Sequence, residues 1–249
     1  MEENKFKLPT EVVELPSKGL LYPEGNLLRE GKVEMKYMTA KEEDILTNQN
    51  YIRQGTVIDK LLSSLIISKI NYNDLLVGDK NAIMIAARIL SYGANYEFMY
   101  DGQKQNVDLS TLEHKPLHSE VTNSGKNEFS FTLPETGNVV TFKLINHGDE
   151  IKIEDEIKGL KKINKDNANE VTVRLSHIIT SINGSSEKKD IRDFVNNYFL
   201  AKDARAFRAY YNEISPDINL KVVLTDSDGV EEDVDLPIGI NFFWPDAWV

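Results

Sequence analysis

The sequence predicts an α+β fold in which helical segments pack with small antiparallel sheets or hairpins. Three observations predict it: an apolar helix over residues 79–93, period-two strands beside two Asp-Gly turns, and a hydrophobic fraction of 41%. The length of 249 residues allows one large or two small domains, and the hydrophobic fraction supports a packed core rather than disorder.

The first 30 residues are expected to form an extended arm with turns, because prolines and glycines punctuate them. The apolar side chains of this arm must be buried either on their own domain or on a neighbouring protein. These side chains are Val12, Val13, Leu15, Leu20, Leu21 and Tyr22. Residues 31–38 then alternate between apolar and charged side chains, which predicts a half-buried strand.

Three helices are predicted after this strand. Thr39 and Glu42 have the spacing of a capping box, and Thr56 gives a weaker start signal for the second helix. The third helix covers residues 79–93, with Asp79 as its N-cap and Gly93 as its stop. Because this helix is apolar nearly all round, we expect it to be central and to pack against the second helix.

The middle of the chain predicts a small antiparallel sheet. Residues 96–109 alternate on both sides of Asp101-Gly102, a strong turn dipeptide, and therefore predict a hairpin. A polar loop is expected over residues 110–126. Residues 129–133 and 140–144 then predict two further strands joined by a turn.

The rest of the chain predicts helices and a final hairpin. Residues 171–182 fit either a helix or a strand, and we favour a helix. The last helix starts near Asp203, and Pro216 ends it. The other expected elements are an exposed charged helix over 149–165, a loop over 164–169, a helix over 191–198, a hairpin around Asp228-Gly229 and an aromatic tail over 241–249.

The predicted elements divide the chain into three segments. Residues 1–38 form the arm and first strand, residues 39–146 the helical pair with antiparallel hairpins, and residues 147–249 a helical segment with the C-terminal hairpin and aromatic tail. The Asp101-Gly102 and Asp228-Gly229 turns are each followed, four residues later, by Val-Asp-Leu, and each hairpin is preceded by a helix that starts at an aspartate.

This echo predicts two helix-plus-hairpin halves. Coincidence is the alternative, because Asp-Gly turns and alternating strands are common. Hairpins that pair in different registers, or stand in different relation to their helices, would contradict the duplication.

Composition excludes several classes of function. The formal charge of −11 disfavours a broad nucleic-acid-binding face, and the lysines of residues 158–165 are interpreted as a solvated helix face. The chain has no cysteine, which excludes disulfides, thiolate zinc sites and a cysteine nucleophile. It has no apolar run of about 18 residues and a charged beginning, so neither a membrane span nor a signal peptide is expected.

No catalytic, cofactor-binding or metal-binding residue is predicted. His114 and His118 have the spacing of a helical metal pair, but Pro116 between them argues against that helix. His177 is interpreted as a satisfied, partly buried side chain. No phosphate-binding glycine loop or nucleophile turn occurs, and the acidic runs at residues 42–44 and 231–233 are typical of solvated faces.

Arg88 and the aromatic tail are the remaining candidates for partner contact. Arg88 lies in the apolar helix, where it either pairs with a carboxylate, caps carbonyl groups in the core or binds a partner. Aromatic side chains at the end of the chain are typical of interface anchors, and packing on their own domain is the alternative. They are Phe242, Phe243, Trp244 and Trp248.

Several stretches together resemble a known family. They are LPSKGLLYP at 15–23, MTAKEEDIL at 38–46, the helix at 79–93 with Arg88, LPETGNVVTFKL at 133–144 and FFWP at 242–245. In this order they resemble the baseplate hub assembly proteins of T-even-type tailed bacteriophages. The resemblance implies a non-enzymatic role in building the central hub of a contractile tail, in the cytoplasm of the infected cell.

The implied partners are other phage baseplate hub or tail proteins, and no nucleic acid is implied as a partner. No membrane span is expected, and the resemblance does not specify the oligomeric state. The resemblance implies that many members of this family carry cysteine pairs in the two hairpins, suggesting zinc-ribbon-like knuckles. This chain has no cysteine, so no metal is carried over.

Three functions are therefore weighed. The leading one is a chaperone-like hub assembly factor whose apolar arm and aromatic tail contact its partners. The second is a structural hub subunit retained in the virion baseplate. The third is a hydrolase, which requires two carboxylates about 5–10 Å apart in a cleft.

Overall fold

A computed structural model describes residues 8–163, 169–225 and 229–243 of the chain. The described elements confirm the α+β class. Up to residue 124 they are β1 (Thr10–Glu14), η1 (Leu27–Glu30), β2 (Lys32–Lys36), α1 (Ala40–Leu46), α2 (Gln49–Gln54), α3 (Val57–Leu65), η2 (Tyr72–Asp74), α4 (Val77–Tyr92), β3 (Asn95–Tyr100), β4 (Gln103–Asp108), η3 (Leu109–Thr111) and α5 (Ser119–Ser124). They continue with β5 (Phe129–Thr132), β6 (Val139–Phe142), α6 (His147–Ile163), α7 (Glu170–Ile178), β7 (Ile179–Ile182), α8 (Lys188–Asn197), α9 (Ala201–Ile214), β8 (Lys221–Thr225), β9 (Glu231–Asp235) and η4 (Ile240–Phe243).

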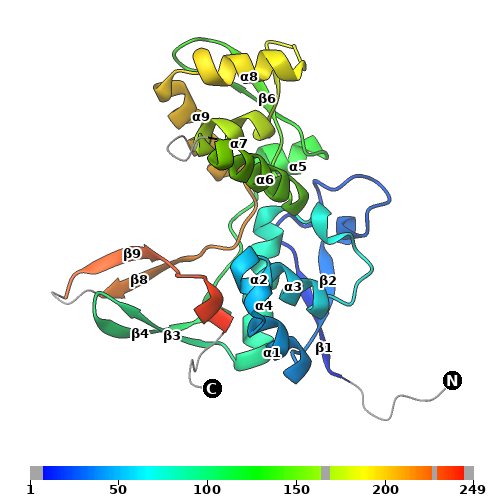
Figure 1. The fold of residues 1–249 in the computed structure, drawn as a ribbon, viewed down its shortest axis with the longest axis vertical. Coiled ribbons are helices and arrows are strands. Elements are labelled where there is room, and N and C mark those ends of the chain that lie inside the picture. The colour runs from blue at the N-terminus through cyan, green and yellow to red at the C-terminus, as the bar shows by residue number, and fades with distance from the viewer. Residues whose placement is uncertain (1–7, 164–168, 226–228, 244–249) are drawn as a thin grey trace.

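The molecule is elongated, with helices at both ends of its long axis (Figure 1). Helices α6 to α9 gather with β6 at one end, and α1 to α4 gather with β1 and β2 towards the other. The hairpins β3–β4 and β8–β9 project together beside the second group. Their contact is real, because Tyr100 Oη donates to Glu232 Oε2 at 2.9 Å and Gln105 Nε2 donates to the carbonyl of Thr225 at 3.1 Å.

The expected arm is one strand of a hairpin. β1 pairs antiparallel with β2, with Thr10 opposite Lys36 and Glu14 opposite Lys32. A bridge between Met35 and Ile66 adds a third chain segment to the free side of β2. The capping box at the start of α1 is confirmed, since Glu42 Oε2 accepts from the backbone N–H of Thr39 at 3.0 Å.

The central helix is confirmed, but its predicted start is wrong. α4 begins at Val77, with Leu76 at the N-cap position, so Asp79 is its third residue. Gly93 ends it as predicted. The helix is buried on several sides because α3, β1, η3 and η4 all pack against it.

Two further predictions need correction. The loop expected over residues 110–126 contains the end of η3 and the short helix α5. The helix favoured for residues 171–182 is right for α7 and wrong for β7, which pairs antiparallel with β6 as the third strand of the β5–β6–β7 sheet. The expected loop over 164–169 lies almost wholly outside the described residues.

The two Asp-Gly hairpins differ in register, which contradicts the duplication in the form that the echo suggested. In β3–β4, Tyr100 pairs with Gln103, so Asp101-Gly102 is a two-residue turn. In β8–β9, Thr225 pairs with Glu231, which leaves five residues between the strands. The helices stand differently too: α4 ends two residues before β3, whereas α9 ends six residues before β8.

A longer internal repeat does exist, and it also includes the sheets and helices before those hairpins. We call residues 10–109 the first half and residues 129–236 the second half. Each begins with a hairpin, continues through a helix into a segment that pairs with the second strand, and then reaches a helix with a buried aspartate. Residues 62–68 (LSSLIIS) and 175–181 (LSHIITS) occupy equivalent places at the end of α3 and across the α7–β7 boundary.

The buried aspartate ties each first hairpin to its helix. Asp79 of α4 accepts hydrogen bonds from the backbone N–H of Ser17 at 2.9 Å and from its hydroxyl at 2.7 Å. Asp203, also the third residue of its helix, accepts from the backbone N–H of Glu135 and the hydroxyl of Thr136, both at 2.8 Å. Their donors lie in two turns of the same pattern, LPSKG at 15–19 and LPETG at 133–137.

The two halves meet closely beside the start of α4. The backbone N–H of His147 donates to the carbonyl of Leu75 at 2.8 Å. Gly78 lies so near the segment after α9 that a Cβ at this position would come within 1.9 Å of the Pro216 carbonyl oxygen. Only glycine fits this approach. The three-segment division at residues 38 and 146 stays a prediction.

Candidate functional site

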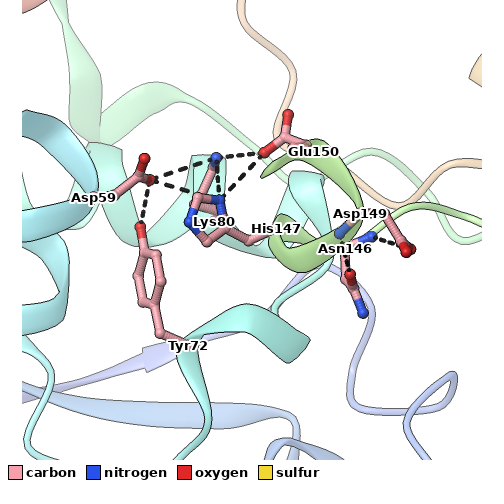
Figure 2. A network of polar contacts seen from close by, with 7 residues as sticks. All are labelled: Asp59, Tyr72, Lys80, Asn146, His147, Asp149 and Glu150. Atoms are coloured by element: carbon pink, nitrogen blue, oxygen red, sulfur yellow. Dashed lines mark hydrogen bonds and ion pairs between the residues drawn. The ribbon is translucent and has the colours of Figure 1, made fainter. Parts of the chain in front are cut away.

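A cluster of ionisable side chains lies where the two halves meet (Figure 2). Lys80 of α4 is at its centre, 2.6 Å from Glu150 Oε2, 3.3 Å from His147 Nδ1 and 3.7 Å from Asp59 Oδ1. Tyr72 Oη donates to the same Asp59 oxygen at 3.0 Å. The cluster therefore joins α3, η2 and α4 of the first half to α6 of the second.

Burial and pairing shift the titration of this cluster. Burial alone would raise the pKa of Glu150, but contact with His147 and the Lys80 ammonium outweighs it and lowers that pKa to about 2. Burial, followed by the neighbouring Asp59 carboxylate, raises the pKa of Tyr72. Glu150 is therefore ionised and bound at neutral pH, and Tyr72 is a neutral donor.

A second set of contacts fixes the beginning of α6. The backbone N–H of Asp149 donates to Asn146 Oδ1 at 2.9 Å (Figure 2). This bond satisfies an N–H group that a helix start leaves without an intrahelical partner. The Asp149 carboxylate in turn pairs with Lys143 at 2.7 Å. The start of α6 is thus held in place, which positions His147 and Glu150 towards Lys80.

The carboxylates of Asp59 and Glu150 line a cavity of about 400 Å³ between α3, α4 and residues 236–239, which we call the first groove. A hydrolase of the paired-carboxylate class needs a general acid whose pKa is raised, so that it holds a proton near neutral pH. The pKa of Glu150 is shifted in the opposite direction, because His147 and Lys80 bind its charged form. The arrangement is that of an ion-pair joint between the halves.

The histidines occupy separate places. His118 precedes α5 and caps it, its Nδ1 accepting from the backbone N–H of Glu120 at 3.2 Å, while His114 lies outside that helix in a bridge to Ile218. His177 contacts Glu156 at 2.8 Å. Within the described ranges, no three His, Asp or Glu side chains are grouped so as to hold a metal ion.

The structure places most of the predicted arm contacts inside the protein. Leu15, Leu21 and Tyr22 are buried in the core, where Tyr22 Oη donates to Asp79 at 2.6 Å. Val13 and Leu20 are half-buried against the same core. Of the arm residues singled out in the sequence, Val12 alone is mainly exposed, at 55%. Of the two alternatives, burial on the chain's own domain is therefore what the structure has for the others.

Arg88 and the described part of the aromatic tail are internal as well. The Arg88 guanidinium donates to the carbonyls of Gly93 at 2.8 Å and Asn95 at 3.1 Å, so it caps carbonyl groups in the core. Phe242 and Phe243 are fully buried, and Phe242 packs edge-on against Tyr96. These three side chains are not available to a partner in this conformation. Trp244 and Trp248 lie outside the described residues.

Sequence reasoning missed the roles of Asp79, Asp203 and the two turns that they hold. Both turns were visible as parts of separate motifs, but their shared pattern, Leu-Pro-x-x-Gly, was not compared. Gly19 and Gly137 have φ values of +76° and +71°, which explains the glycine at the end of each turn. A search for repeated turn patterns would have found this signal.

The fold and these sites define an α+β protein built from two similar halves. Its described clusters of ionisable side chains connect elements of the same chain to one another. No helix in the described part of the chain has the length and apolar character needed to cross a membrane. A family model described as T4 bacteriophage base plate protein matches residues 9–244, which is nearly the whole chain. The chain belongs to this family and is a phage baseplate protein. No curated protein and no solved structure matches it.

Proposed function

We propose that the chain is a non-enzymatic, chaperone-like assembly factor for the central hub of a contractile tail baseplate. The observation that carries the proposal is the family match over residues 9–244. In this proposal the protein acts in the host cytoplasm through contacts with other hub or tail proteins. The alternative is a structural hub subunit that stays in the virion, and the family match supports a baseplate role for either function.

Co-purification from infected cells distinguishes the two functions. The tagged chain is isolated during assembly, and mass spectrometry is applied both to the complex and to purified mature particles. An assembly factor is expected with hub proteins in the complex and at trace levels in the particles. A fixed stoichiometric amount in the particles would establish the structural subunit instead. Absence of hub and tail proteins from the complex would contradict both.

The exposed part of the arm gives a sharper test than removal of the arm. Deleting residues 1–23 would remove Leu15, Leu21 and Tyr22 from the core and unfold the protein. Val12 is exposed and stands opposite Glu34 in β2, so Val12→Lys keeps the fold and adds an attractive cross-strand pair. If β1 contacts a hub protein, this lysine should reduce recovery of that protein about tenfold, because a long charged side chain would replace an apolar one in the interface.

Val223→Lys is the matched control for this variant. Val223 is 62% exposed and stands opposite Asp233 in β9. Both substitutions therefore replace an exposed strand valine that faces a carboxylate on the neighbouring antiparallel strand with lysine. Circular dichroism checks that both variants are folded. Equal recovery of hub proteins with both variants would exclude the exposed face of β1 as a contact.

A further inference from the structure

The internal repeat gives two equivalent helix pairs, and each pair borders a groove. The first groove lies between α3 and α4, and a second groove of about 350 Å³ lies between α7 and α9. Three pairs of lining residues correspond in sequence: Ile58 with Val171, Leu62 with Leu175, and Met84 with Arg208. Met84 lies five residues after Asp79, and Arg208 lies five residues after Asp203. The two halves therefore use the same surface of the same helix pair.

The chain's own backbone covers one side of the first groove. Leu236 and Ile238 line it, and Leu236 is buried, held by a hydrogen bond of 2.9 Å from its N–H to the carbonyl of Leu220. These residues follow the acidic strand β9 and lie in a proline-containing segment without regular secondary structure, residues 236–239. A non-helical segment with large apolar side chains therefore covers this surface in the first half.

The second groove has no such cover among the residues that the structure describes. All of its described lining comes from α7, α9 and Ile145. Leu175, Ile178 and Phe207 form a buried apolar floor, while Val171 at the rim is 52% exposed. A smaller cavity of about 170 Å³ shares Ile145, Arg174, Tyr211 and Asn212 with it, so the groove continues towards Pro216.

Two arginines give this groove a charge opposite to that of the protein as a whole. Arg174 of α7 and Arg208 of α9 both line it and both are exposed. Neither donates a hydrogen bond or forms an ion pair with a side chain in the described ranges, although the chain carries a net charge of −11. Glu170 also lines the groove, but its carboxylate is bound by Lys161 at 2.7 Å. The two guanidinium groups beside the apolar floor therefore fit a ligand that combines apolar and carboxylate side chains.

We propose that the groove between α7 and α9 binds an extended segment of another baseplate protein. In this segment, large apolar side chains occupy the floor formed by Leu175 and Phe207, and neighbouring Asp or Glu side chains pair with Arg174 and Arg208. The apolar part of this chemistry is that of the chain's own Leu236 and Ile238 at the first groove. That the partner is a baseplate protein rests on the proposed function.

Photo-crosslinking in infected cells tests the proposal. Benzoylphenylalanine is placed at Val171, on the rim of the groove, and in a separate variant at Tyr198, which is 62% exposed and does not line it. We expect Val171 to crosslink to a peptide of another baseplate protein that carries large apolar residues next to carboxylates. The double variant Arg174→Glu/Arg208→Glu should reduce this product at least tenfold.

Arg205→Glu is the matched control, because Arg205 is exposed on the same helix and does not line the groove. Three results would overturn the inference: crosslinking at Val171 no stronger than at Tyr198, a crosslink to a second copy of this chain, or a yield that charge reversal leaves unchanged. Co-purification of hub proteins in these cases would leave the proposed function intact. Loss of every baseplate protein from the purified complex would instead contradict the proposed function.

Discussion

At the scale of single residues, long-range pairing decides what the buried polar side chains do. The local sequence predicts Asp79 as a helix N-cap, yet its carboxylate accepts hydrogen bonds from Ser17 and Tyr22, which are more than 50 residues away in sequence. Burial raises the pKa of Asp79, and hydrogen bonds from Ser17 and Tyr22 oppose that rise. The pattern of an aspartate before an apolar run therefore identified an important residue but not its partner.

Glu150→Gln is predicted to destabilise the protein at neutral pH. The pKa of Glu150 falls from 4.5 to about 2 on folding, so its contribution is fully present above about pH 4.5 and is lost as the pH falls towards 2. The shift corresponds to about 3 kcal/mol in the free energy of unfolding. Urea denaturation of both proteins over this pH range should show a difference that shrinks in acid.

Glu154→Gln is the control for this prediction, since Glu154 pairs with Lys158 on the exposed face of the same helix. Its effect should be about 0.5 kcal/mol or less. A Glu150→Gln difference that persists unchanged at low pH would show that packing, and not ionisation, causes the loss.

At the scale of elements, local signals predicted what local interactions form. The two-residue turn at Asp101-Gly102 and the capping box at Thr39 depend on a few neighbouring residues, and both are present. β7 was missed because residues 179–182 become a strand only by pairing with β6, which is about 40 residues earlier in the chain. The burial of Phe242 in its own domain was not predicted for the same reason. Composition indicates that an aromatic side chain must be covered, but it does not indicate which surface covers it.

Gly78 and Gly159 give a matched pair of helix substitutions. Gly78→Ala should destabilise the protein by about 2 kcal/mol or more, because its Cβ would meet the Pro216 carbonyl at 1.9 Å and push α4 away from the segment after α9. Gly159→Ala in α6 meets nothing within 4 Å and should stabilise by about 0.5–1 kcal/mol. Thermal unfolding of both variants measures the difference, and effects of the same sign would contradict the close approach.

At the scale of the whole molecule, the sequence indicated only part of the internal repeat, the helix-plus-hairpin units that include Asp79 and Asp203. The hairpin echo that suggested it differs in register, whereas the repeat that the structure reveals rests on the turn and aspartate pairs. Repeats of this kind are hard to see in one sequence, because only the few positions that contact one another need to keep their chemistry. The open groove between α7 and α9 was missed for the same reason, since Arg174 and Arg208 meet only in the folded chain.

The repeat predicts that each turn and aspartate pair stabilises mainly its own half. Asp79→Ala leaves the Ser17 and Tyr22 donors without an acceptor, and Asp203→Ala does the same for Thr136, at a cost of about 3 kcal/mol each. Hydrogen exchange monitored by mass spectrometry should then show faster exchange in β1, β2 and α4 for the first variant and in β5, β6 and α9 for the second. If both variants raise exchange equally throughout the described chain, the two halves open as one unit, and the contacts around Gly78 and Lys80 couple them more strongly than each aspartate holds its own turn.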